Sequence, residues 1–116
     1  MKRDYQRLLD IQEAIGKIEK YADRGREAFY KDELIQTWVV YHLQIIGEAI
    51  GKLSEELKDL YPEVPWKKIR GMRNILVHNY FGIDLDIVWR VIEAELPDLK
   101  EHIISMLKNE RPLDLE

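Results

Sequence analysis

Apolar residues recur every three or four positions along most of the chain, which is the spacing of amphipathic helices. Asp4 is a candidate cap for a first helix, whose apolar stripe is formed by Leu8, Ile11, Ile15 and Ile18. Residues 23–33 form a polar break with one glycine, and Asp32 can cap the helix that follows. The apolar spacing then predicts one long helix from Glu33 to Leu60.

Two glycines and two prolines mark the next features. Gly47 and Gly51 leave a notch on the long helix, which favours the close approach of a neighbouring backbone. Pro62 and Pro65 end that helix, because proline has no N–H for helical hydrogen bonding. A third helix is predicted from about Trp66 to His78 or Tyr80.

A fourth helix is predicted after a stop at Gly82 and a cap at Asp84. Pro97 lies inside it and should kink it or split it in two. Residues 109–116 are expected to fray. The sequence therefore predicts an all-α fold, an up-and-down bundle of four to five helices in a single domain spanning residues 1–116.

Composition narrows the class of protein without identifying it. Apolar residues make up 46% and charged residues 34% of the 116 residues, which is typical of a globular domain rather than a disordered chain. There is no cysteine, so disulfides and thiolate chemistry are excluded, and a cytoplasmic location is expected. No apolar run predicts a membrane span, and the charged N-terminus is unlike a signal peptide.

The net charge of −4 counts against a general nucleic-acid binder, but the charge is unevenly distributed. Between Trp66 and Tyr80 the charged side chains are all basic, namely Lys67, Lys68, Arg70 and Arg73. On a helical wheel the core-facing side of this segment carries Ile69, Met72, Ile75 and Leu76. The other side carries Lys67, Arg70, Arg73, Asn74, Val77 and His78, with Tyr80 beside Arg73.

This polar face combines side chains suited to cleaving RNA without a metal. His78 can deprotonate a ribose 2′-hydroxyl or protonate the leaving oxygen, and Arg73 can stabilise charge on the transition state. Asn74 precedes His78 by one helical turn and can orient its ring. Tyr80 can add a hydrogen bond or stack on a base. Lys67 and Arg70 are candidate contacts to the RNA backbone.

The spacing of Arg73 and His78 leaves two arrangements open. Five residues along a straight helix separate their directions by about 140°. Either the helix unwinds near His78, or a second copy of the chain completes the cleft in a two-fold dimer. By composition and spacing alone, the same residues also fit a solvated helix face.

Other polar residues carry weaker indications. Glu48 precedes Lys52 by four residues, which favours an intrahelical ion pair over a role in orienting active-site groups. His42 is interpreted as a packed or interfacial side chain, and no His, Asp or Glu spacing predicts a metal site. No glycine-rich phosphate loop is present, so no cofactor is expected.

The segment RNILVHNY, residues 73–80, resembles the motif of the HEPN superfamily, and its H-x-Y ending is similar to HEPN toxins paired with a minimal nucleotidyltransferase (MNT) antitoxin. The similarity extends through IIGEAIGKLSEEL, YPEVPWKKIRGMRNILVHNYFGID and AELPDL. The resemblance implies a metal-independent ribonuclease toxin, acting on transfer or messenger RNA as a homodimer whose motif helices meet at a shared cleft. It also implies that Arg73 and His78 are catalytic, that Asn74 supports them, and that the antitoxin attaches AMP to Tyr80.

Two other functions are compatible with the sequence. In the first, the chain is a non-catalytic helical partner or substrate-binding subunit of a nucleotidyltransferase, and the basic face is a docking surface. In the second, the chain is itself the antitoxin, although its compact composition is unlike the disordered, partner-wrapping form common among antitoxins. Cleavage of RNA by the purified chain separates the ribonuclease hypothesis from both.

Overall fold

The computed structural model describes residues 2–77 and 84–111, with side chains at 3–71 and 84–111. The described residues are almost entirely helical and contain no strand, which confirms the predicted all-α class. No helix among them is both long enough and apolar enough to cross a membrane. In chain order the elements are α1 (Lys2–Ala22), α2 (Arg26–Lys31), α3 (Glu33–Lys52), α4 (Glu55–Leu60), α5 (Trp66–Val77), α6 (Leu85–Arg90), the π-helical turn η1 (Val91–Glu95) and α7 (Leu96–Asn109).

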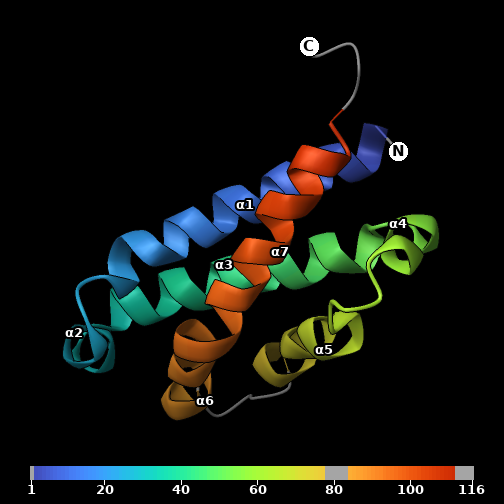
Figure 1. Ribbon diagram of the computed structural model, residues 1–116. Helices are drawn as coiled ribbons and strands as arrows, with labels where there is room; N and C mark the ends of the chain where they lie inside the picture. Colours follow the sequence, from blue (N-terminus) through green and yellow to red (C-terminus); the bar gives the residue numbers. More distant parts are fainter. Residues whose placement is uncertain (1, 78–83, 112–116) are drawn as a thin grey trace.

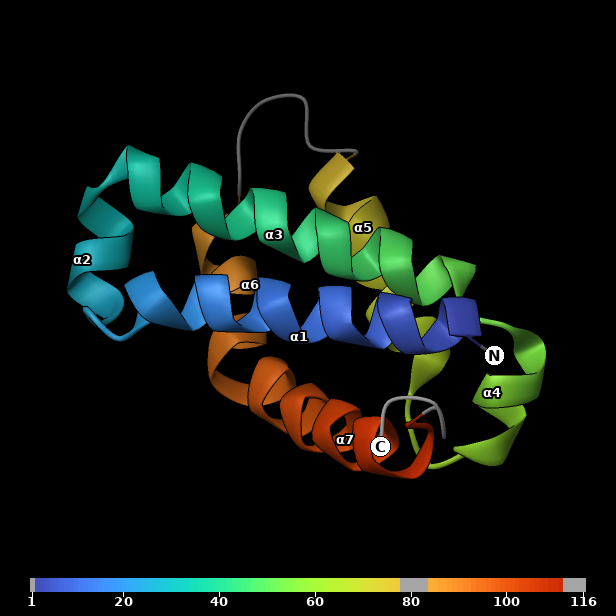
Figure 2. The same ribbon diagram turned by 90° about the horizontal axis from the view of Figure 1, so that it is seen from above.

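The two longest helices, α1 and α3, lie side by side and run in opposite directions (Figure 1). Figure 2 shows α7 packed along α1 and α5 on the other side of α3. The core lies between these helices, and its fully buried side chains include Leu8, Ile11, Ile18, Val39, Ile46, Ile50, Ile103 and Met106. The apolar stripes predicted from the sequence are therefore the helix faces that pack together. Helix α3 packs against both α1 and α5.

Asp4 does not cap α1 as the sequence predicted, because α1 begins at Lys2 and Asp4 lies in its first turn. Its side chain is only 5% exposed. One carboxylate oxygen accepts a hydrogen bond from the backbone N–H of Ser54 at 2.9 Å, and the other accepts one from the Ser54 hydroxyl at 2.6 Å. Asp4 therefore ties the start of α1 to the start of α4.

The predicted long helix from Glu33 to Leu60 is wrong, because the chain breaks after Lys52 into α3 and α4. Leu53 is extended, with φ −65° and ψ 144°. The hydroxyl of Ser54 accepts from the N–H of Leu57 at 3.1 Å and so caps α4. The two hydrogen bonds that Asp4 accepts from Ser54 hold Ser54 in this capping position.

The polar break at residues 23–33 also contains a short helix, α2, that the sequence analysis missed. Its Phe29 is fully buried and packs at a 5.3 Å ring-centroid distance from Trp89. The predicted cap at Asp32 is confirmed, since its carboxylate accepts from the N–H of Leu34 at 2.9 Å. One buried aromatic is enough to fix a single turn against the body of the protein.

The predicted split of the last helix is confirmed. Asp84 caps α6, because its carboxylate accepts a hydrogen bond from the N–H of Ile87 at 3.2 Å. After α6 the chain continues through the π-helical turn η1 into α7, which has Pro97 in its first turn. The π-helical turn adds a residue just before the proline, where a regular helix would place a carbonyl against the proline ring. Gly82 and residues 112–116 of the expected frayed tail lie outside the described residues.

Candidate functional site

Helix α5 carries the candidate site, and its start is fixed by Trp66. The indole N–H of Trp66 donates to the backbone oxygens of Lys58 at 3.2 Å and Tyr61 at 3.1 Å. Ile69, one turn later, is 5% exposed and faces the core as predicted. These contacts set the rotation of α5, so the opposite face of the helix is the one that meets solvent.

Four of the predicted site residues are not described as side chains. Arg73 and Asn74 belong to the backbone of α5, one turn beyond Arg70, and their side chains lie outside the described residues. His78 and Tyr80 follow the last described residue of α5 and also lie outside. The predicted grouping of Arg73 with His78 therefore stays a prediction.

The two predicted RNA-contacting residues, Lys67 and Arg70, are both exposed on α5 as the helical wheel indicated. Lys68 beside them is paired with Glu95 of η1, at 3.1 Å between its ammonium nitrogen and a carboxylate oxygen. Within the described part of the chain, neither Lys67 nor Arg70 forms an ion pair. Their charges are therefore available to a ligand, whereas the charge of Lys68 is partly neutralised.

The notch predicted on α3 is occupied by a side chain at Gly51. A Cβ atom built on Gly51 would meet Nε of Arg70 at 3.7 Å, which is ordinary van der Waals contact. The Nε atom of Arg70 thus lies close to α3 at this exposed glycine. The expectation of a neighbouring backbone at the notch is wrong for Gly51, because the atom nearest to it belongs to a side chain of α5. Gly47 is buried, as close packing requires.

A groove runs between α4 and the start of α5, and the sequence analysis did not anticipate it. Its apolar lining, which we call the floor, is formed by Pro62, Val64, Pro65 and Trp66. Its charged lining consists of four cations, Lys58, Lys67, Lys68 and Arg70, and two acidic groups, Glu55 and Asp59. In the sequence, only the two prolines indicate a break at this point. The groove itself could not be predicted, because its lining residues, such as Lys58 and Trp66, come from different elements that are brought together by the fold.

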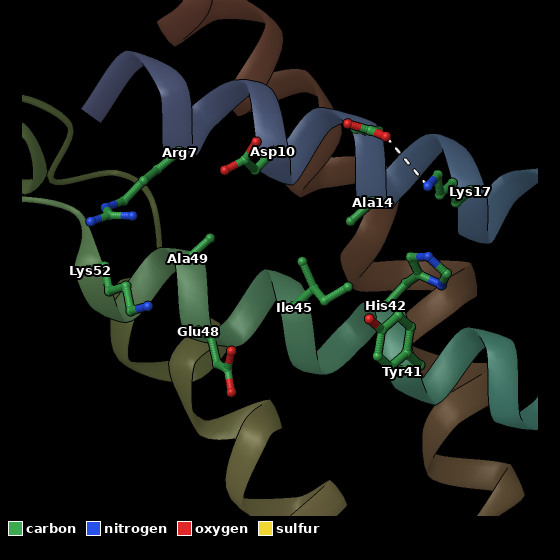
Figure 3. Close-up of a pocket in the computed structure, with 11 residues that line it drawn as sticks. Arg7, Asp10, Ala14, Lys17, Tyr41, His42, Ile45, Glu48, Ala49 and Lys52 are labelled. Carbon is green, nitrogen blue, oxygen red and sulfur yellow. Dashed lines mark ion pairs between the residues drawn. The ribbon is translucent and has the colours of Figure 1, made fainter. Parts of the chain in front are cut away.

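A second groove lies between α1 and α3 and has mixed charge (Figure 3). His42 lies in it, 4% exposed, with its Nδ1 atom 2.7 Å from the backbone oxygen of Trp38. The His42 ring packs against the rings of Trp38 and Tyr41, so the interpretation of His42 as a packed side chain is confirmed. Figure 3 also shows the Glu48 carboxylate on the side of α3 away from α1.

The ion pair expected between Glu48 and Lys52 is not among those that the described residues form. Glu48 is exposed, and its carboxylate is free to meet a group from outside α3. Among the described residues there is no cluster of three or more His, Asp or Glu side chains that could hold a metal ion.

Residues 11–106 match the protein family described as "Ribonuclease HepT-like". The match covers most of the chain, including α5 and the segment RNILVHNY. The chain belongs to the HepT-like ribonuclease family. This confirms the resemblance to HEPN proteins that the motif indicated.

Curated relatives of this HepT-like chain have similar lengths in most cases. It is 39% identical over 102 residues to the "Probable ribonuclease HepT" of Thermococcus cleftensis, covering 86% of this chain and 93% of that protein. It is 38% identical over 101 residues to "Putative RNase TTE0752" of Caldanaerobacter subterraneus, covering 87% and 90%.

A third relative is longer. The "Gamma-glutamylcyclotransferase and putative RNase MJ0434" of Methanocaldococcus jannaschii is 37% identical over 110 residues, which cover 93% of this chain and 50% of that protein. This HepT-like chain therefore spans about half the length of that relative. No solved structure matches the chain.

Proposed function

We propose that this protein is a ribonuclease that cleaves RNA by metal-independent transfer at the 2′-hydroxyl. The observation that carries the proposal is the family match over residues 11–106, which includes Arg73 and His78. Relatives named as RNases cover almost the same span. The described face of α5 supports it, because Lys67 and Arg70 are exposed cations on the helix that carries Arg73 and have no ion-pair partner among the described residues.

In the proposed reaction the 2′-oxygen attacks the adjacent phosphorus while His78 accepts its proton or protonates the departing 5′-oxygen. The bond from phosphorus to the 5′-oxygen breaks, and a 2′,3′-cyclic phosphate remains on one product. Arg73 stays protonated throughout and binds the phosphate oxygens that gain charge. Asn74 orients the His78 ring, and Tyr80 hydrogen-bonds to the substrate or stacks on a base.

A homodimer with the cleft between its two motif helices is the second part of the proposal. Support comes from α3, the helix on which α5 packs. It exposes Leu34 at 81% and Tyr41 at 58%, and Trp38 and Ile45 lie near them on the same helix. An exposed apolar stripe of this kind is typical of a surface covered by another protein.

We also propose that the protein is the toxin of a toxin–antitoxin pair, silenced when a cognate MNT-type nucleotidyltransferase attaches AMP to Tyr80. The physical reason is electrostatic and steric. Tyr80 is two residues from His78, so an adenylate there would occupy the cleft and place a negative charge where the RNA backbone binds. Purified protein from cells with and without the partner gene should differ by the mass of one AMP on Tyr80.

The decisive experiment compares wild type and His78→Ala, both expressed without any partner protein. The wild type is expected to slow growth and to degrade RNA in EDTA, whereas His78→Ala should lose RNA cleavage by more than about a hundredfold and keep its helical spectrum. His102→Ala is the matched control, since it makes the same substitution on a different helix, α7, outside the segment RNILVHNY. Cleavage that survives in His78→Ala would remove His78 from the mechanism.

Absence of cleavage by the wild type would favour the alternative, a non-catalytic partner or substrate-binding subunit of a nucleotidyltransferase. The exposed cations of α5 would then form a docking surface. In that case binding of the nucleotidyltransferase should be lost when Lys67 and Arg70 are replaced by glutamine, and neither the wild type nor the variant should cleave RNA.

A further inference from the structure

The groove between α4 and the start of α5 is lined in part by residues of α5, the helix that carries Arg73. Lys67, Arg70 and Arg73 follow one another at three-residue intervals, so each lies about 4.5 Å further along the helix axis than the last. A chain bound at Arg73 therefore meets Arg70 and Lys67 within a short distance. The start of α5 is its end nearest α4 (Figure 1), and the residues that line the groove come from these two elements and the segment between them.

The groove is divided by charge. Its α5 side carries Lys67 and Arg70, which have no ion-pair partner among the described residues. On the α4 side, Lys58 is paired with Glu55 at 3.7 Å, and its side chain is only 10% exposed. Asp59 also lies on the α4 side. A polyanion would thus be attracted to the α5 side and repelled from the α4 side, which confines it to one path.

The apolar floor of the groove is suited to contact with the base of a nucleotide, while the cations beside it are suited to the phosphate. Pro62, Pro65 and the partly exposed ring of Trp66 supply flat apolar surface beside the cations. The Trp66 ring is held in place by its two hydrogen bonds to backbone oxygens, so it offers a fixed face at little entropic cost. Apolar or aromatic surface next to cations is the combination that binds single-stranded nucleic acid, with bases on the one and phosphates on the other.

We propose that this groove binds the nucleotides that flank the cleaved bond in a single-stranded RNA, with Lys67 and Arg70 on consecutive phosphates and a base against Pro65 and Trp66. The inference rests on the proposed ribonuclease function and names its substrate class. A duplex is a poor ligand here, because its bases are stacked on each other and cannot reach the floor. The site also explains how a protein of net charge −4 binds RNA, since contact is limited to one described basic path.

The test measures binding separately from cleavage. In a His78→Ala background, a fluorescent single-stranded RNA of about a dozen nucleotides is titrated against the parent and against Lys67→Gln/Arg70→Gln. The affinity should fall about tenfold or more, and the slope of log K against log salt should shrink by about 1.4, as expected for two lost phosphate contacts on a single strand. A duplex of the same sequence should bind the parent weakly and show little change.

The matched control is Arg90→Gln/Lys108→Gln, which makes the same change in net charge on α6 and α7. It should bind like the parent. Equal losses in both double variants would show a general charge effect and would overturn the groove, as would an unchanged salt slope in Lys67→Gln/Arg70→Gln. Preference for the duplex would overturn the choice of single strands.

Cleavage assays keep this inference distinct from the proposed function. With His78 intact, Lys67→Gln/Arg70→Gln should lose kcat/KM on the long RNA, mainly through KM, whereas Arg90→Gln/Lys108→Gln should cleave the same RNA at the parent rate. RNA cleavage with no difference between the two double variants refutes the groove alone. If the groove binds RNA selectively but neither the wild type nor any variant cleaves it, the proposed ribonuclease function is refuted and the groove stands as an RNA-binding site.

Discussion

At the scale of single residues, Asp4 shows how one side chain can act on an element 50 residues away. Its nearly buried carboxylate satisfies both the N–H and the hydroxyl of Ser54, which in turn caps α4. A buried donor that loses its acceptor costs more than a surface hydrogen bond contributes, because it has already lost its water. The end of α3 therefore depends on a residue of α1.

We expect Asp4→Ala to lower the free energy of unfolding by about 2–3 kcal/mol, since it leaves two donors of Ser54 without their acceptor. Asp10→Ala is the matched control. It makes the same substitution on the same helix at an exposed site and should cost no more than about 0.5 kcal/mol. Urea unfolding at one protein concentration, followed by circular dichroism, gives both values. Similar midpoints for the two variants would contradict this account of Asp4.

At the scale of elements, the sequence predicts what depends on local spacing and misses what depends on distant partners. The apolar periodicity, the caps at Asp32 and Asp84 and the split at Pro97 are all readable within a few residues. The break at Ser54 is not, because a serine inside an apolar repeat becomes a cap only when Asp4 is placed against it. The exposed face of α5 was predictable by the same local logic, whereas the groove beside it needs α4 in position.

The π-helical turn η1 sets the rotation of α7 relative to α6. Val88 and Trp89 before it and Leu99 and Ile103 after it are all buried. Removing one residue from the turn would rotate everything after it by about 100° and bring exposed positions toward the core. The extra residue is therefore structural, and its exposed position Ala94 allows a clean test.

Deletion of Ala94 should destabilise the protein by more than about 4 kcal/mol or prevent folding, because the buried faces of α6 and α7 can no longer be buried together. The substitution Ala94→Ser keeps the residue count and should change stability by no more than about 0.5 kcal/mol. Thermal and urea unfolding of the two variants make the comparison. A deletion variant as stable as the serine variant would show that α7 repacks freely around α1.

At the scale of the whole molecule, the arrangement of helices gives α3 two tasks. One face completes the core with α1 and supports α5, and another exposes the apolar stripe that includes Leu34 and Tyr41. The proposed dimer would use that stripe to bring two α5 helices together. Since Arg73 and His78 diverge by about 140° on a straight helix, a second copy could supply the missing partner to each of them.

Dimers with defined substitutions decide whether the two residues act within one chain or between chains. In a purified heterodimer of Arg73→Ala with His78→Ala, a site built between chains joins the intact Arg73 of one to the intact His78 of the other. One of the two sites survives, so about half the wild-type rate is expected. A site built within one chain is broken in both subunits, and no cleavage is expected.

The complementary heterodimer pairs wild type with a chain that carries both substitutions, and it should behave in the opposite way. Both sites between chains lose one residue, so RNA cleavage should disappear, whereas a site within one chain would keep about half the rate. The two heterodimers have the same number of substitutions and the same net charge, which makes each the control for the other. We expect the first to cleave RNA and the second to be inactive, because a straight helix through residues 73–78 would not direct both side chains at one phosphate. The reverse result would mean that the helix unwinds near His78.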